Sequence, residues 1–310
     1  MAVVEVRELG KRYGGRAVVN GVSFDVADGE IFGIVGPNGA GKTTTVECIE
    51  GLRRPDAGEI RVLGLDPQRD GREVRRLLGA QLQASRLPER LKVGEALDWF
   101  AAFYDDPADP AELLELLGLL EHRGVRFAKL SGGQQQRLSI ALALVGGPRV
   151  AVLDELTTGL DPQARRDTWG LIEQVRDRGV SILLVTHLME EAERLCDRIA
   201  VIDRGRVVAL DTPAAIAIEA GGEHRLRFVP SAPVDRQRLA QLAGVSSVEQ
   251  HHEAVIVAGD GQVVQTVMAW LTREQVVAQQ LRIEQPDLDD AFVALTGRSL
   301  DEADEAEVER

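Results

Sequence analysis

Short runs of apolar residues alternate with longer amphipathic segments along this chain. Four of the runs are almost purely valine, isoleucine, leucine and similar residues, and they lie at Ile31–Val35, Val150–Leu153, Ile182–Val185 and Ile199–Ile202. Strands that are apolar on both faces are typical of a parallel sheet covered by helices on both sides. The pattern therefore predicts an α/β core.

Two further patterns lie beside this core. Residues Val3–Leu9 and Val22–Val26 alternate between apolar and polar positions, which predicts antiparallel strands. From about Leu87 to Leu144 the apolar spacing becomes helical, so we expect a helical subdomain at about residues 84–145. We assign all these segments to one domain, residues 1–220.

The last third of the chain has a separate pattern that begins after Gly221 and Gly222. The predicted order is β-α-β-β-α-β, with strands at Arg225–Val229, Ser247–His251, Ala254–Val257 and Val277–Ile283, and helices at Asp235–Leu242 and Val263–Thr272. This order predicts a small α+β ferredoxin-like domain over residues 221–297. Residues 298–310 are expected to form an acidic, disordered tail, because six of the last ten residues are acids.

Composition restricts the possible partners and the compartment. The formal net charge of -14 argues against nucleic acid as a partner, because phosphate binding needs clustered basic residues. The two cysteines, Cys48 and Cys196, stand apart in apolar segments, which favours buried thiols in a reducing compartment over a disulfide or metal site. No apolar stretch approaches the ~20 residues that span a bilayer, and the first residues do not resemble a secretory signal. We therefore expect a cytoplasmic protein that reaches a membrane only through a partner.

The segment with the clearest chemistry follows the first apolar run. It consists of Gly36, Pro37, Asn38, Gly39, Ala40, Gly41, Lys42, Thr43 and Thr44. Glycines let successive backbone amides surround phosphate oxygens, and the following helix offers its positive N-terminus to the same anion. Lys42 can reach the β and γ phosphates, and the Thr43 hydroxyl can bind Mg²⁺. A purely structural glycine turn is disfavoured by the preceding strand and the helix-compatible residues after it. By itself, this loop does not distinguish ATPases, GTPases and kinases.

Two acids follow the second apolar run directly. Asp154 and Glu155 are therefore expected at the carboxyl edge of the sheet, where open α/β folds usually bind ligands. Asp154 can hold Mg²⁺ through water, and Glu155 can orient or deprotonate an attacking water. The alternative is a pair of solvated acids in a loop.

A second potential anion site lies at Ser131, Gly132, Gly133 and Gln134. The serine and glycines are expected to begin a helix, which gathers hydroxyl and amide donors at its positive end. A serine cap with a glycine turn is the purely structural alternative. The run from Leu130 to Arg137, with the phosphate-binding loop upstream, resembles the signature sequence of the ATP-binding cassette (ABC) ATPases. The resemblance covers about residues 3 to 215.

Membership in that family implies ATP and Mg²⁺ as cofactors and a homodimer of cassettes. Ser131–Gln134 would contact the γ phosphate held by the opposite subunit, so that two ATP molecules lie between two copies. Asp161, in the segment Thr158–Pro162, resembles the D-loop at this dimer interface and is expected near ATP. His187 resembles the switch histidine that senses the γ phosphate, and with Glu155 and Lys42 it completes the expected catalytic set.

Two further residues are assigned by the same resemblance. Gln83 fits the family's Q-loop, which contacts ATP and Mg²⁺, although Gln81 is close enough to take that place instead. Tyr13 fits the aromatic residue that stacks on adenine, and the alternative is a half-exposed strand tyrosine. The expected Mg²⁺ ligands are thus Thr43, Gln83 and Asp154. One departure is Leu156, where the family usually has proline, and this departure puts the stiffness of the loop beside Glu155 in doubt.

A single cassette of this kind resembles the ATPase subunit of bacterial drug and antibiotic-resistance exporters of the ABC-2, daunorubicin-resistance type. The similar segments are Gly79–Gln83, Val93–Leu97 and Asp287–Arg298. The resemblance implies a separate integral membrane permease and a peripheral position on the inner face of the cell membrane. The alternatives are a soluble ABC ATPase acting on DNA or ribosomes and a binding module with weak catalysis.

Overall fold

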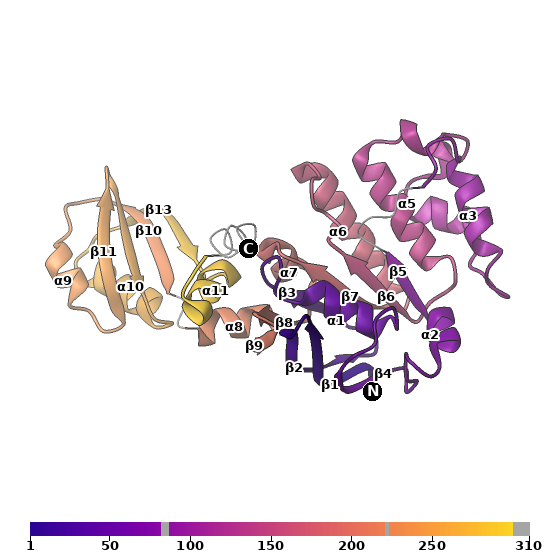
Figure 1. Cartoon of the computed structure of the whole chain (residues 1–310). Coiled ribbons are helices and arrows are strands. Elements are labelled where there is room, and N and C mark those ends of the chain that lie inside the picture. Colours follow the sequence, from indigo (N-terminus) through magenta and orange to yellow (C-terminus); the bar gives the residue numbers. More distant parts are fainter. Residues whose placement is uncertain (82–86, 221–222, 300–310) are drawn as a thin grey trace. The chain divides into compact units, whose positions relative to one another are not determined.

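The computed structural model describes residues 1–81, 87–220 and 223–299 (Figure 1). The chain forms two compact units, Met1–Pro213 and Ala214–Ser299. The division lies at the start of helix α8 (Pro213–Glu219), whereas the sequence placed the boundary after this helix. Within the described ranges, no helix is both long and apolar enough to cross a membrane.

The first unit is organised around a six-stranded sheet. Its strand order is β5 (Leu78–Gln81), β6 (Val150–Asp154), β7 (Ser181–Thr186), β3 (Ile31–Val35), β8 (Arg198–Asp203) and β9 (Arg206–Asp211). Neighbouring strands from β5 to β8 are parallel, and β9 is antiparallel to β8. Every residue of β3, β6 and β7 is buried. The α/β core predicted from the apolar runs is thus confirmed.

One face of this sheet packs against a smaller sheet and two helices. The smaller sheet has the order β2 (Arg16–Ala27), β1 (Ala2–Tyr13), β4 (Ala57–Val62) and is antiparallel throughout. Helices α1 (Lys42–Ile49) and α2 (Gly71–Leu77) contribute to the same buried cluster. The antiparallel strands expected at Val3–Leu9 and Val22–Val26 are confirmed within β1 and β2.

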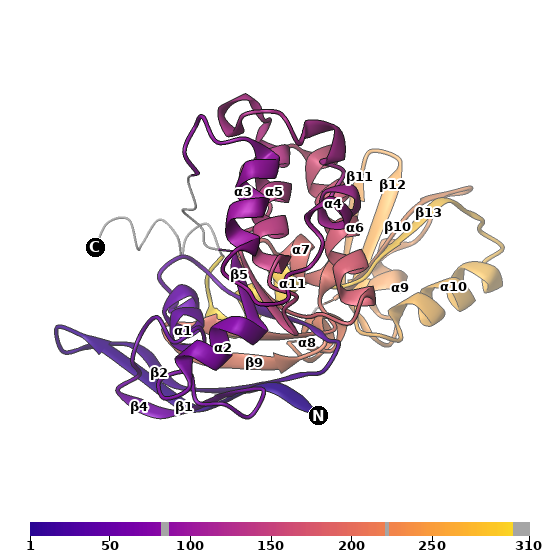
Figure 2. The same cartoon turned by 90° about the vertical axis from the view of Figure 1, so that its right-hand side faces the viewer.

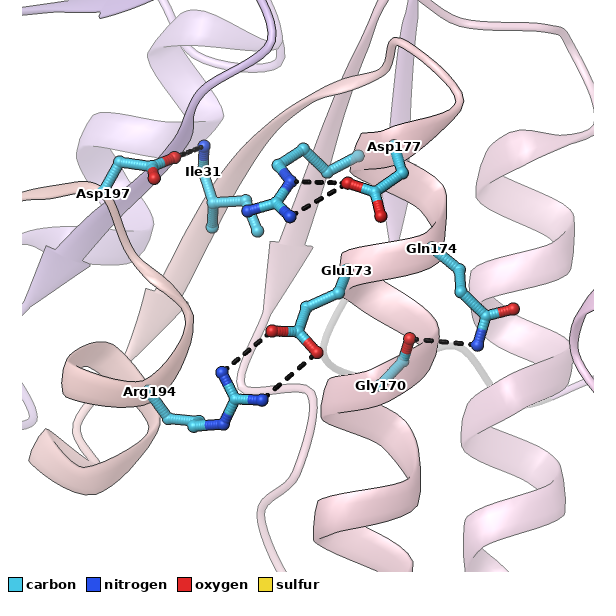
Figure 3. Close-up of polar contacts among 8 residues, drawn as sticks. Ile31, Gly170, Glu173, Gln174, Asp177, Arg194 and Asp197 are labelled. Carbon is cyan, nitrogen blue, oxygen red and sulfur yellow. Dashed lines mark hydrogen bonds and ion pairs between the residues drawn. The ribbon is translucent and has the colours of Figure 1, made fainter.

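Helices α5 (Gly132–Leu144), α6 (Pro162–Asp177) and α7 (Met189–Leu195) accompany the parallel strands. Helix α5 contacts β5 and β6, α7 contacts β3 and β7, and α6 contacts both helices. An ion pair of 2.8 Å between Arg194 Nη1 and Glu173 Oε1 joins α7 to α6 (Figure 3). The Asp197 carboxylate accepts a hydrogen bond of 2.9 Å from the backbone N–H of Ile31, which ties the end of α7 to β3 (Figure 3).

The expected helical subdomain is also present. It contains α3 (Val93–Ala101), α4 (Pro110–Leu116), short 3-10 turns at Leu120–His122 and Phe127–Lys129, and then α5. Figure 2 shows α3 and α5 next to each other, and α4 contacts both. Leu97, Leu114 and Leu138 are fully buried, one from each of these helices. The apolar positions at helical spacing therefore lie on the buried faces of these helices.

The second unit contains the β-α-β-β-α-β order that the sequence predicted, followed by one further helix that was not predicted. After α8 come β10 (His224–Pro230), α9 (Arg236–Ala240), β11 (Val245–His251), β12 (Ala254–Gly259), α10 (Val263–Arg273), β13 (Ala278–Glu284) and α11 (Leu288–Thr296). The strands form an antiparallel sheet in the order β11-β12-β10-β13 (Figure 2). Helices α9 and α10 pack on one face of it, with Leu239 and Trp270 against Phe228. The expected tail lies outside the described residues from 300 onward.

Candidate nucleotide-binding and hydrolysis site

The phosphate-binding loop connects β3 to α1 through two positions that require glycine. Gly36 has φ +149°, and a Cβ there would lie 2.0 Å from the carbonyl oxygen of Ile202. Gly41 has φ +101°, and its Cβ would lie 2.6 Å from the carbonyl oxygen of Val18. Neither space admits a side chain, so the loop can make this tight path only with glycine. Pro37 and Ala40 are buried, while Asn38 and Gly39 are exposed at the surface of the loop.

Lys42 is the first residue of α1, and its side chain is 5% exposed. Its ammonium donates hydrogen bonds of 2.7 Å to the carbonyl of Gly36 and 2.9 Å to that of Pro37. The positive charge of Lys42 is thus held beside the backbone of the phosphate-binding loop. Thr43 is exposed in the same turn and Thr44 is half-buried. Thr45, which the sequence did not single out, donates from Oγ1 to the Gly41 carbonyl at 2.9 Å and fixes the start of the helix.

Asp154 and Glu155 lie at the carboxyl end of β6, as the sequence predicted. His187 follows β7, the next strand of the sheet. The Nδ1 atom of His187 lies 3.4 Å from Oε1 of Glu155. The backbone N–H of Glu155 donates to the carbonyl of Val185 at 2.9 Å, which continues the ladder between β6 and β7. Two strands therefore bring the acid and the histidine together.

Burial changes the acidity of Asp154. Its side chain is 6% exposed, and desolvation, followed by the neighbouring charge of Glu155, raises its pKa to about 6. Lys42 acts in the opposite direction, so the phosphate-binding loop and Asp154 share one electrostatic environment. Asp154 Oδ1 is buried without a hydrogen-bond partner in the described part of the chain. A buried carboxylate oxygen with no partner is suited to a hard cation or its water.

Glu50, at the end of α1, is an acid of this region that sequence reasoning missed. It is 4% exposed, and burial, with Asp154 as the next cause, raises its pKa to about 7. The sequence gives little indication that Glu50 is buried near Asp154. A charged residue near the end of a helix is usually solvated, and only the tertiary fold places this one near Asp154.

The segment Ser131–Gln134 begins α5, as expected. Ser131 is the N-cap: its Oγ accepts from the N–H of Gln134 at 3.3 Å, and Gln134 Oε1 accepts from the N–H of Ser131 at 2.9 Å. The amide of Gln134 also lies 2.9 Å from the ring of His122. Gly132 is followed by Gly133, which is half-buried. None of the hydrogen bonds that these residues form in the described ranges reaches Gly36–Thr44.

Asp161 is the N-cap of α6. Its carboxylate accepts hydrogen bonds of 3.0 Å from the N–H groups of Gln163 and Ala164. These bonds, that of Ala164 above all, lower the pKa of Asp161. Asp161 is exposed, and its two hydrogen bonds give it a capping role within one chain.

Tyr13 ends β1 and is 40% exposed. Two cations lie over its ring, with Lys11 Nζ at 5.7 Å and Arg53 Cζ at 5.4 Å from the ring centroid. Gln83 lies outside the described residues. Gln81 ends β5 opposite Leu153, is 6% exposed, and leaves Oε1 without a hydrogen-bond partner among the described residues. It therefore adjoins the strand end that carries Asp154.

A buried network behind the two acids was also missed. Glu191 on α7 is fully buried, and its Oε1 accepts hydrogen bonds from Thr157 Oγ1 at 2.7 Å and from Trp169 Nε1 at 3.1 Å. Thr157 stands two residues after Glu155, and Trp169 lies on α6. The network thus connects the loop after the acids to both helices. In the sequence, Glu190 and Glu191 look like two solvated acids.

A parallel sheet with a glycine-rich loop, Lys42 and a strand-end carboxylate defines a P-loop nucleotide-binding protein. Comparison with known proteins gives the family. Residues 19–158 match the ABC transporter family. The chain is 39% identical over 313 residues to the Nod factor export ATP-binding protein I of Paraburkholderia xenovorans, covering 96% of this chain and 98% of the relative. The protein of the same name from Rhizobium etli is 34% identical, covering 97% and 95%. The chain therefore belongs to the ATP-binding subunits of ABC transporters, and it is an ATPase.

Solved structures agree with this assignment. An ATP-binding subunit of an ABC transporter superposes with a TM-score of 0.64 at 31% identity, covering 71% of this chain and 93% of its own. A subunit of the cbiONQ transporter complex of Clostridium perfringens gives a TM-score of 0.64 at 28% identity, covering 69% and 90%. A dimeric cassette bound to ADP and phosphate gives 0.61 at 25% identity, covering 67% and 98%. The fold of an ABC ATPase predicted from the sequence is thus confirmed.

Proposed function

We propose that this chain hydrolyses ATP in a homodimer and thereby drives a separate membrane permease that exports a drug or another hydrophobic compound. The observation that carries the catalytic part is the Glu155–His187 pair beside Asp154 and the phosphate-binding loop. Export is supported by relatives that match 96% of the chain and are named for Nod factor export. The class of cargo rests on the sequence resemblance to drug-resistance subunits.

Each residue of the site has a proposed task. The amides of Gly36–Thr44 bind the phosphates, and Lys42 leaves its carbonyl partners to neutralise the β and γ phosphates. The hydroxyl of Thr43 and the carboxylate of Asp154 would hold Mg²⁺, which neutralises phosphate charge when bound. Either Gln83 or Gln81 would complete this set, and Gln81 has the partnerless buried oxygen.

The water is activated by Glu155. Its carboxylate orients the water and accepts its proton as the oxygen attacks the γ phosphate. His187, 3.4 Å away, holds the carboxylate in place and donates to the γ phosphate oxygens. Tyr13 is 40% exposed and is proposed to stack on adenine.

The dimer is proposed because Ser131–Gln134 form an anion site that serves no phosphate of their own loop. In a head-to-tail pair this site would meet the γ phosphate bound by the other copy, with Asp161 near the interface. A related cassette that is dimeric with ADP and phosphate supports this arrangement. Tight closure then depends on ATP, which couples hydrolysis to opening.

The permease is proposed to contact the helical subdomain from the cytoplasmic side, which places the chain on the inner face of the membrane. Helix α3 and the residues after it expose two large aromatic side chains, Trp99 at 51% and Phe103 at 72%. Exposed aromatic residues of this kind are enriched at protein interfaces. The second unit is proposed to be an accessory domain of the ferredoxin-like class, a proposal supported by its β-α-β-β-α-β element order.

The decisive test replaces Glu155 by glutamine. We expect Glu155→Gln to bind ATP with the affinity of the wild type and to lose at least about 100-fold in kcat, since general base catalysis contributes roughly this much. The matched control is Glu190→Gln, an exposed acid of α7. Steady-state ATPase activity equal to that of the wild type would refute the assignment.

Light scattering should show ATP-dependent dimers of Glu155→Gln, and a strict monomer at saturating ATP would contradict the proposed dimer.

A further inference from the structure

The four-stranded sheet of the second unit has one covered face and one open face. Leu226, Phe228, Val255 and Val257 point into the cluster under α9 and α10. Side chains alternate along a strand, so the residues between them point to the other face. On β10 these are Arg225, Arg227 and Val229. Arg225 and Arg227 are exposed, and Val229 is half-buried.

A cavity of about 730 Å³ lies on this open face. Its lining includes Arg227, Val229, His251, Ala254 and Arg282, all at positions that alternate away from the helices. Sites for small molecules usually measure about 300 to 1,000 Å³. The cavity therefore has the size of a small organic ligand.

Two arginines define the chemistry of this cavity. Arg227 and Arg282 are direct partners in the register of β10 and β13, so their side chains project from the same point of the sheet. Neither forms an ion pair with an acid anywhere in residues 1–81, 87–220 or 223–299. Like charges directly opposite each other destabilise a sheet. A bound anion would remove this repulsion and would accept both guanidinium groups in a bidentate manner.

The rest of the lining is partly apolar. Val229 and Ala254 lie at the same end of the sheet, and Leu281 is 37% exposed. The pairing of β10 with β13 is irregular here, and Gln280 adopts φ +52°. Such a bulge redirects side chains and is common at binding sites. The cavity thus offers two guanidinium groups beside an apolar surface, and its lining also includes one exposed carboxylate, that of Glu253.

We propose that this open face binds a small amphipathic anion, an organic carboxylate, sulfonate or phosphate ester with an apolar portion. Arg227 and Arg282 hold the acid group, and Val229, Ala254 and Leu281 contact the apolar portion. The inference concerns the second unit and does not depend on the proposed export function.

The test uses the full chain saturated with ADP, so that the probe is excluded from the nucleotide site. The probe is anilinonaphthalene sulfonate, an amphipathic anion whose fluorescence rises on binding. We expect saturable one-to-one binding, with an affinity reduced at least about tenfold in Arg227→Gln and in Arg282→Gln, because each charge-assisted hydrogen bond carries roughly this factor. The matched control is Arg225→Gln, on the same face but outside the cavity. Circular dichroism and thermal unfolding verify that the variants fold.

Two results would overturn the proposal. The first is equal affinity of the wild type, Arg227→Gln and Arg282→Gln. The second is displacement of the probe by inorganic sulfate at the probe's own concentration, which would indicate a site for simple anions.

Discussion

Replacing Glu50 by glutamine tests the electrostatics of the site through stability. Glu50 is 4% exposed, and burial raises its pKa from 4.5 to about 7. An acid with a raised pKa contributes stability that is fully present below its unfolded pKa and is lost as the pH rises through its folded pKa. The difference between the two values is about 2.5, and 1.36 kcal/mol per pKa unit gives at most about 3 kcal/mol.

The side chain that Glu50→Gln introduces cannot ionise, so this variant should not lose this contribution to stability as the pH rises. We compare the free energy of unfolding of the variant with that of the wild type at each pH. The advantage of the variant should be larger at pH 8 than at pH 4.5, by up to about 3 kcal/mol. The assay is urea denaturation at a series of pH values in EDTA without nucleotide, so that no cation offsets the buried charge. The matched control is Glu115→Gln, an exposed acid of α4. If the wild type and Glu50→Gln change in parallel from pH 4.5 to 8, the reasoning is refuted.

Three further changes probe other parts of the site. Gly36→Ala should abolish measurable nucleotide binding in calorimetry, because its Cβ would lie 2.0 Å from a backbone oxygen of β8, whereas Gly170→Ala, with free space around it, should bind normally. Below pH 6, the approximate pKa of Asp154, the affinity of the ATP complex for Mg²⁺ should fall about tenfold per pH unit, since only the carboxylate binds the cation. An affinity for Mg²⁺ that does not change from pH 7 to pH 5 would contradict this. Glu191→Leu should cost about 2 to 5 kcal/mol in urea unfolding, because it removes the acceptor of Thr157 and of a buried indole; a cost below about 1 kcal/mol would contradict it.

The core of the fold could be predicted because its strands are buried on both faces. In β3, β6 and β7 the burial appears directly as continuous apolar sequence. Strand β4 was not predicted, because its first half is exposed and its partner β1 is distant in sequence. Strand β9 was also not predicted, although it carries apolar residues and pairs with the preceding strand β8. The missed strand β5 is short and includes Gly79 and Gln81. Its partner β6 begins 72 residues after β5 does, as their bounds 78 and 150 show.

The candidate site, like the fold, has parts that could be predicted from the sequence and parts that could not. Contiguous segments such as Gly36–Thr44 could be recognised because their backbone geometry requires particular residues in a fixed order. Glu50 and Glu191 could not, since a glutamate in a helix gives the same signal whether it is solvated or buried. Glu190 and Glu191 illustrate this: the first is exposed, and the second is completely buried. Only the packing of α6 and α7 distinguishes the two.

The loop beside Glu155 brings these points together. Leu156 stands where the family usually has proline, and the sequence therefore put the stiffness of this loop in doubt. In the structure Leu156 is fully buried, and Glu155 adopts φ +47° while its N–H donates to Val185. Thr157 is fixed to Glu191 by a bond of 2.7 Å. Packing and hydrogen bonds thus restrain the loop where a ring would restrain it covalently. Because Glu191 lies on the helix that follows His187, the same restraint positions both members of the proposed catalytic pair.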